Sequence, residues 1–351
     1  MGPTLVIPLN HIFSFLQVDP VPSTSHRHDI VIHPPSFGVP WPTTFPAARQ
    51  CRYWKLAILA CEELVRDMRA LRTQTNKRLP DWFSQSNAAD PTSNHKERLL
   101  VDTSVSAAIY MAPNSAPERI QIIAQLFLLL WTHDVVDSIM QDLLSLSRKE
   151  KPGATLEMVP SLTFGSELLD DCHGLLRVVL AHFCTWVCFT REQQRTNFGD
   201  LRDYLDYRAS DIAADTVSSC VRWGNRLDLQ TAELASVQEV VNLAMDHIIL
   251  VNDLFSFNRE KNAAVEEGAL FLNAVHYLEG VLGVHSPLAK DLTMQLVWDF
   301  ESKVTAKIRH LRQCDRQYSA QWRYLDAMVE AAAGNLFFSL TSVRYGAKRH
   351  D

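Results

Sequence analysis

Apolar residues recur every three to four positions along most of the chain, which is the spacing that places them on one face of an α-helix. This periodicity predicts a succession of helices separated by short polar stretches. The expected helices cover residues 51–71, 117–146, 167–189, 191–223, 231–261, 266–282, 287–314 and 317–347. Strand-like alternation is rare and no βαβ series is present. The pattern therefore predicts an all-α fold built as one large helical bundle.

The beginning of the chain departs from this pattern. Residues 1–47 are rich in Pro, Ser and Thr and predict an extended N-terminal arm laid over a single helical domain, residues 48–351. Polar stretches at 84–94 and 148–161 predict loops between helices. No internal repeat or shift in composition marks a second domain.

Composition excludes several classes of protein. A chain of 351 residues with 47% hydrophobic content can bury a large core. Its net charge of -6 comes from 34 basic and 40 acidic residues without long runs of one sign, so no nucleic-acid partner is expected. The seven cysteines form no CxxC pair, and the longest apolar run is far shorter than the roughly 20 residues that cross a bilayer. We expect a cytoplasmic protein with reduced thiols and no membrane span.

One short segment suggests chemistry. In VNDLFSFNREK, residues 251–261, the side chains of Asn252, Ser256 and Glu260 stand four positions apart and share one stripe of a helix. Their amide, hydroxyl and carboxylate oxygens are hard ligands that suit Mg²⁺. A solvated helix face would use the same residue types, so the stripe alone does not decide between a metal site and a surface.

Other residues favour the metal site. Asp134 and Asp137 stand one turn apart at the end of the most apolar segment. Arg208 precedes the stripe, and Arg344 with Tyr345 follows the last apolar helix. An arginine there can donate a planar fork to phosphate oxygens, with the tyrosine hydroxyl as a second donor.

Together these residues resemble the class I terpene cyclases of the microbial single-domain type. Segment 251–261 is similar to that family's second metal-binding motif, the NSE pattern, at Asn252, Ser256 and Glu260, with Lys261 directly after it.

The resemblance extends along roughly residues 49–348. Arg208 falls where the family has its diphosphate-sensing arginine, and Arg344 with Tyr345 matches its C-terminal RY pair. Phe338 stands where a Trp is usual.

The resemblance implies a bundle of the class I terpenoid synthase type with its active-site cavity in the centre, three Mg²⁺ ions and an isoprenoid diphosphate substrate. The implied substrate is farnesyl diphosphate, the implied product a sesquiterpene hydrocarbon or alcohol, and the implied assembly a monomer or homodimer. Arg208, Lys261, Arg344 and Tyr345 would bind the diphosphate.

Three aromatic side chains, Phe127, Trp131 and Phe338, are candidates to line the cavity. Phe127 and Trp131 lie at positions i and i+4 and so face the same way. Aromatic faces can stabilise a carbocation without offering a nucleophile. Packing in the core is the alternative role for all three.

The family's first motif, the aspartate-rich DDxxD/E, is altered here. In one register His133 replaces the leading aspartate, and Asp134 and Asp137 follow. In the other register Asp134 leads, Val135 takes the second position and Ser138 the last. We favour the second register, because Mg²⁺ accepts an imidazole poorly. Asp134 would then be the main carboxylate ligand, and Asp137 would be a second ligand or would hold a metal-bound water.

Two alternatives to a cyclase stay open. A prenyl chain-elongating synthase shares the fold but needs two intact aspartate-rich motifs, and a non-catalytic helical homologue would be consistent with the altered first motif. Elsewhere, His26 and His28 in the arm suggest a solvated loop, and Cys184 with Cys188 suggests core thiols.

Overall fold

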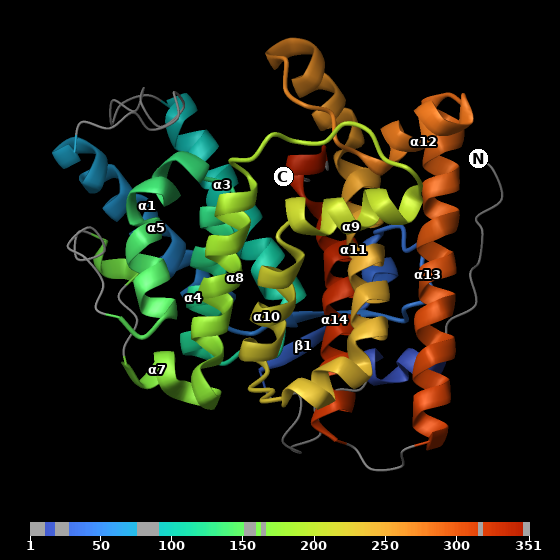
Figure 1. Ribbon diagram of the computed structural model, residues 1–351, viewed down its shortest axis with the longest axis horizontal. Helices are drawn as coiled ribbons and strands as arrows, with labels where there is room; N and C mark the ends of the chain where they lie inside the picture. Colours follow the sequence, from blue (N-terminus) through green and yellow to red (C-terminus); the bar gives the residue numbers. More distant parts are fainter. Residues whose placement is uncertain are drawn as a thin grey trace.

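The computed structural model describes residues 11–17, 28–75, 91–150, 159–162, 166–314 and 319–346, and these form an α-helical bundle (Figure 1). The α-helices are α1 (Trp54–Thr75), α3 (Pro91–Met111), α4 (Pro117–Leu130), α5 (His133–Ser147), α7 (Ser166–Asp170), α8 (Leu175–Phe189), α9 (Leu201–Asp211), α10 (Ala214–Gly224), α11 (Thr231–Glu267), α12 (Ala274–Leu282), α13 (Ser286–Cys314) and α14 (Ala320–Thr341). Short 3₁₀ helices are η1 (His11–Gln17), η2 (Pro34–Phe37), η3 (Pro160–Leu162), η4 (Asp171–Gly174) and η5 (Val343–Tyr345). The predicted all-α fold is confirmed.

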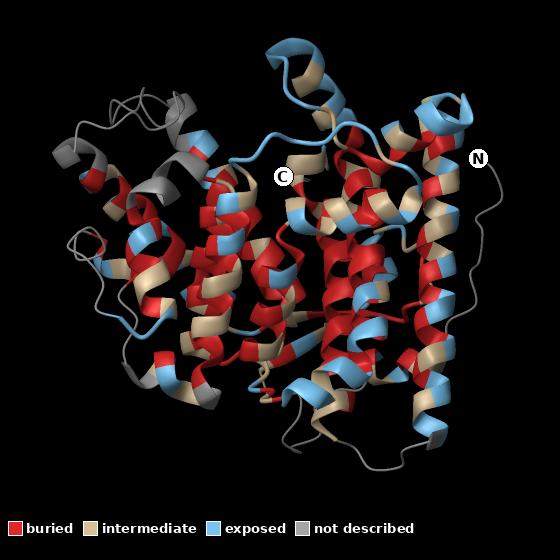
Figure 2. Ribbon diagram, in the orientation of Figure 1, coloured by how far each residue is buried: buried red, intermediate tan, exposed pale blue. Residues whose placement is uncertain are grey.

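Helix α14 is the axis of the bundle. It packs against α11, α3 and α10, and its residues are buried almost continuously from Tyr324 to Ser339. Figure 2 shows this centre in red, whereas α13 turns a pale blue face to solvent. Close packing at the axis depends on Gly334, because an added Cβ there would lie 1.9 Å from the Tyr110 carbonyl oxygen of α3.

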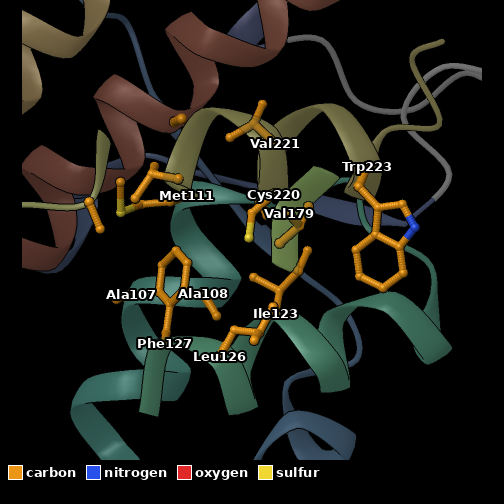
Figure 3. Packing of buried hydrophobic residues seen from close by; sticks show 14 of the residues in the cluster. Ala107, Ala108, Met111, Ile123, Leu126, Phe127, Val179, Cys220, Val221 and Trp223 are labelled. Atoms are coloured by element: carbon orange, nitrogen blue, oxygen red, sulfur yellow. The ribbon is translucent and has the colours of Figure 1, made fainter. Parts of the chain in front are cut away.

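A second packed region joins α3, α4, α8 and α10 (Figure 3). Met111 and Phe127 lie near one another there, and Val179 and Cys220 fill the space between α8 and α10. All four side chains are buried. This packing fixes α3 and α4 relative to α8 and α10.

The N-terminal arm is anchored by a small sheet. Strand β1 (Asp29–Ile32) pairs antiparallel with β2 (Ala48–Cys51), across the expected end of the arm. Within this pair the Arg49 guanidinium donates to the Asp29 carboxylate, with Nε 2.5 Å from Oδ2, and both side chains are fully buried. Arg49 also donates to the Leu16 carbonyl of η1 at 3.1 Å, so it holds η1 against the sheet.

A buried carboxylate fastens the arm to the bundle. Glu301 of α13 accepts hydrogen bonds from the hydroxyls of Thr43 and Thr44, both at 2.6 Å, and its Oε1 lies 3.2 Å from Nε2 of His247 on α11. Burial alone would raise the pKa of Glu301, but hydrogen bonds from His247 and the two threonines outweigh burial and lower it. The carboxylate therefore stays charged and tied to the arm.

Helix α3 is a correction to the sequence-based prediction. Residues 95–111 were assigned to no helix, and the loop expected at 84–94 is wrong from Pro91 onward, where α3 begins. Polar residues inside α3 obscure the periodicity of its apolar positions. Two of them, Thr103 and Ser104, are tolerated there because each hydroxyl donates to the backbone carbonyl four residues earlier in the helix.

Several predicted helices are interrupted. The one expected at 117–146 breaks between Leu130 and His133, where the Thr132 hydroxyl donates to the Leu128 carbonyl at 3.2 Å. The helix expected at 167–189 divides at Gly174, whose φ is 83°. A break of one or two residues scarcely changes the spacing of apolar residues. The periodicity therefore predicts one continuous helix where the structure has two.

The segment 191–223 is also divided. Residues 191–200 are not helical, and α9 begins after Asp200, whose carboxylate accepts from the Asp203 amide at 2.9 Å. Between α9 and α10, Ala213 has a φ of 61°. Farther on, α11 continues to Glu267 and ends at Gly268, so the helix expected at 266–282 begins only with α12.

Helix α11 is long and apolar enough to cross a membrane by length and composition alone. In the protein, however, 61% of its most apolar stretch of 18 residues is buried, and the helix packs against α13 and α14. Such burial is what a core helix of a bundle shows.

We expect Gly334→Ala to destabilise the protein, because the new methyl group meets backbone rather than a side chain that could move. The free energy of unfolding should fall by about 2–3 kcal/mol, the upper part of the range for overpacking. Denaturant unfolding measures it. Gly280→Ala in α12 is the matched control, since no atom lies within 4 Å of the added Cβ. It should stabilise by about 0.5–1 kcal/mol. Equal effects of the two substitutions would contradict the close α3–α14 packing.

Candidate functional site

A cavity of about 560 Å³ opens at one end of the bundle. Its polar lining comes partly from α9 and from η5 near the C-terminus, and Figure 1 shows α9 and the C-terminus toward the upper end of the bundle. Apolar side chains from α3, α4, α10 and α11 line part of it, and polar side chains from α9, α11 and η5 line another part. Its lining includes Ala107, Met111, Phe127, Trp131, Trp186, Arg208, Asp211, Val217, Ile248, Asn252, Arg259, Glu260, Asn335, Phe338, Arg344 and Tyr345.

The helix stripe on α11 reaches this cavity. Asn252 and Glu260 line it, and the Asn252 amide donates to the Tyr345 hydroxyl at 2.8 Å. Ser256, between them, is buried and its hydroxyl lies 3.5 Å from the Asp253 carbonyl oxygen. A hydroxyl that donates one weak bond keeps two lone pairs for another partner.

Arg208 of α9 is held rigidly at the edge of the same site. Its Nη2 donates to Asp253 Oδ1 at 2.7 Å, and Nη1 donates to Asp211 one turn further along α9. Its Nη2 is also 3.9 Å from Glu260 Oε1. Burial alone would lower the pKa of Arg208, but the Asp253 and Asp211 carboxylates raise it well above its usual value. Arg208 is therefore a permanent cation.

Arg344 is placed differently. Its guanidinium lies over the Trp131 ring, 4.0 Å from the centroid, and its buried Nε has no hydrogen-bond partner among the described residues. Burial, and then the nearby Arg259 cation, lower the pKa of Arg344 to about 10. A guanidinium whose Nε lacks an acceptor and that lines a cavity is suited to binding an anion.

Arg259, which the sequence reasoning missed, also lines the cavity. It follows Asn252 by seven residues, two helical turns, so the sequence did contain the signal. Lys261, which was expected to bind substrate, is not among the lining residues and lies with Nζ 5.4 Å from the Phe257 ring. Lys261 follows Glu260 by one position, so its side chain points about 100° farther around the helix. This explains why Glu260 lines the cavity and Lys261 does not.

The aromatic candidates lie at the cavity. Phe127, Trp131 and Phe338 all line it, and the Phe338 ring packs edge-on against Tyr345, with 5.7 Å between centroids. Asp134 and Asp137 fall in the first turns of α5, which begins two residues after Trp131. The side chains at 133–138 lie outside the described part of the structure.

The remaining candidates do not form sites in the described residues. His26 lies outside them, and His28 Nδ1 is 3.2 Å from the Tyr53 hydroxyl. Cys184 is buried, and burial raises its pKa to about 12, as expected of a core thiol. Cys188 is exposed, so its assignment to the core is wrong. Cys188 lies in the last turn of α8, where Thr185, three residues earlier, is exposed as well.

The oxygens of the α11 stripe fit a hard divalent cation, because they combine one carboxylate with neutral amide and hydroxyl donors. The described residues contain no cluster of three or more His, Cys, Asp or Glu that could hold a metal alone. A metal here would therefore share its coordination among the stripe, oxygens of a ligand and water.

Comparisons with known proteins find similarity to terpene synthases and cyclases. Residues 170–302 match the family model described as terpene synthase family 2, C-terminal metal binding. Terpene cyclase 6 of Gibberella fujikuroi is 29% identical over 333 residues, which is 90% of this chain and 85% of that protein. Terpene cyclase aneC of Aspergillus aculeatus is 27% identical over 339 residues, which is 91% of this chain and 74% of that protein.

A solved structure gives the same fold. Aristolochene synthase from Penicillium roqueforti superposes with a TM-score of 0.59 over 80% of this chain and 94% of that one, at 18% sequence identity. The sequence relatives are terpene cyclases, and the superposition shows that the chain shares the fold of a terpene synthase.

We expect Arg344→Lys to weaken the binding of inorganic diphosphate by about tenfold or more, because an ammonium group keeps the charge but loses the planar fork. Isothermal titration calorimetry in the presence of Mg²⁺ measures the affinity. Arg309→Lys, on the exposed face of α13, is the control and should bind as the unaltered chain does. An unchanged affinity in Arg344→Lys would assign Arg344 to packing over Trp131 alone.

Proposed function

Because the chain belongs to the class I terpene cyclases, we propose that it ionises farnesyl diphosphate in the presence of Mg²⁺ and cyclises the resulting carbocation to a sesquiterpene. The observation that carries the proposal is the division of the cavity. Guanidinium groups and the oxygens of Asn252 and Glu260 line part of it, aromatic and aliphatic side chains line the rest, and the two parts meet where Arg344 lies over Trp131.

The polar side is suited to the leaving group. Arg208, Arg259 and Arg344, with the Tyr345 hydroxyl, would bind diphosphate oxygens and stabilise the negative charge that develops as the carbon–oxygen bond breaks. The bonding electron pair leaves with the diphosphate, and an allylic cation remains. Asn252, Ser256 and Glu260, with Asp134 and Asp137 of α5, would hold Mg²⁺, which when bound neutralises further charge on the diphosphate.

The apolar side is suited to the cation. The rings of Phe127, Trp131 and Phe338 can each stabilise a nearby positive charge by roughly 0.5–2 kcal/mol. They also keep water away, so the cation can react with its own double bonds before it is quenched. Loss of a proton then gives a hydrocarbon, and capture of a water with loss of a proton gives an alcohol.

The direct test is incubation with C10, C15 and C20 isoprenoid diphosphates, with and without Mg²⁺, followed by gas chromatography of extracted products. We expect a cyclic C15 product that requires Mg²⁺. A longer linear diphosphate, formed when isopentenyl diphosphate is added, would show a chain-elongating synthase. Absence of any product with all three substrates would favour the non-catalytic homologue.

Glu260→Gln should reduce turnover by more than about 100-fold, because a direct metal ligand matters more than the outer partners that typically cost 10–100-fold. The fold should persist, since Glu260 borders the cavity and its side chain is 20% exposed. Circular dichroism checks the fold and product yield checks the turnover. Full activity in this variant, or in EDTA, would refute the metal assignment.

The altered aspartate motif gives a separate prediction. If Asp134 leads the motif, Asp134→Asn should abolish product formation, Asp137→Asn should reduce it or alter the product mixture, and His133→Ala should have a mild effect. Product yield and composition distinguish the registers. A His133→Ala variant as inactive as Asp134→Asn would show that the other register is correct, and an active Asp134→Asn would remove the motif from the mechanism.

A further inference from the structure

Asn273 lies between two parts of the site without lining the cavity. It is the N-cap of α12, it is 1% exposed, and its Oδ1 accepts from the Val275 amide at 2.9 Å. Its Nδ2 donates to Glu260 Oε2 at 2.9 Å and to the Asp253 carbonyl oxygen at 2.7 Å. Both N–H bonds and the oxygen of this carboxamide are thus engaged, which fixes its orientation.

The neighbouring backbone holds the other side of the site. The Ala274 amide donates to Asp253 Oδ2 at 2.8 Å, and Asp253 Oδ1 accepts from Arg208 Nη2 at 2.7 Å. Two successive residues at the start of α12, Asn273 and Ala274, therefore contact Glu260 and the Asp253 carboxylate that orients Arg208.

We propose that Asn273 is a positioning residue for Glu260, which it orients for metal binding through the hydrogen bond to Oε2. Because that bond occupies Oε2, Glu260 presents Oε1 on the side of Arg208, 3.9 Å from Nη2. A carboxylate on a helix can otherwise rotate among several rotamers, and each lost rotamer costs free energy when a metal binds. Fixing Glu260 in advance reduces that cost. This proposal rests on the proposed function, since it concerns the metal that the function requires.

Asn273→Ser separates positioning from helix capping. Serine is as good an N-cap as asparagine, so it can still accept from the Val275 amide, but it is too short to reach Glu260 and carries no charge. Loss of such an outer partner typically weakens metal binding about 10–100-fold. We expect the Mg²⁺ concentration that half-saturates binding of inorganic diphosphate to rise by about that factor, as measured by isothermal titration calorimetry well below the melting temperature.

Glu233→Ala is the matched control. It removes a helix-cap bond at the far end of α11, where Glu233 Oε2 accepts from the Gln230 amide at 2.8 Å, and it should leave Mg²⁺ half-saturation unchanged. Asn273→Thr, which also keeps a capping hydroxyl, replaces Asn273→Ser if the serine variant unfolds.

The outcomes distinguish this proposal from the proposed function. If the unaltered chain binds diphosphate with Mg²⁺ and Asn273→Ser does so at the same half-saturation, Asn273 is only a helix cap and the positioning role is refuted. If the unaltered chain shows no Mg²⁺-dependent binding of diphosphate, the proposed function fails and the positioning role fails with it. A raised half-saturation in Asn273→Ser, but not in Glu233→Ala, supports the proposal.

Discussion

The buried Asp253 carboxylate is the constraint on which the polar half of the cavity depends. It is fully buried, and it accepts from Arg208 on one oxygen and from the Tyr204 hydroxyl and the Ala274 amide on the other. Removing one partner of a buried ion pair costs about 3–5 kcal/mol, because the other charge is left uncompensated. Helices α9, α11 and α12 therefore meet in one arrangement, and that arrangement sets the position of Arg208.

The cations of the site differ in how far the protein itself neutralises them. Arg208 already has two carboxylate partners, and its role is geometric as much as electrostatic. Arg344 lies over an aromatic ring, and its Nε has no acceptor among the described residues. That N–H group can therefore donate to a bound ligand. A pKa lowered to about 10 still leaves it charged at neutral pH. The fold thus keeps one guanidinium fixed and another available.

The sequence predicted the helical class and most of the polar residues that meet at the cavity, because both depend on local spacing. Asn252 and Glu260 follow from a four-residue period, and Arg344 with Tyr345 follows from a motif. Lys261 does not line the cavity and Arg259, which does, was overlooked, because the motif gives residue positions and not the direction in which each side chain points. Asn273 could not be found in this way, since its role arises from contacts between helices that are separate in the sequence.

The break between α9 and α10 shows why such contacts decide the site. Ala213 adopts a left-handed φ of 61°, which costs a non-glycine residue about 1–2 kcal/mol. The break persists because the last turn of α9 is tied to other helices: Arg208 to Asp253 on α11, and the Asp211 carbonyl to the Trp186 indole of α8 at 2.9 Å. In a continuous helix that carbonyl would instead accept from the amide four residues later. The strained residue lies at the cavity wall, and the tertiary bonds that hold it there leave no signal in the apolar periodicity of the chain.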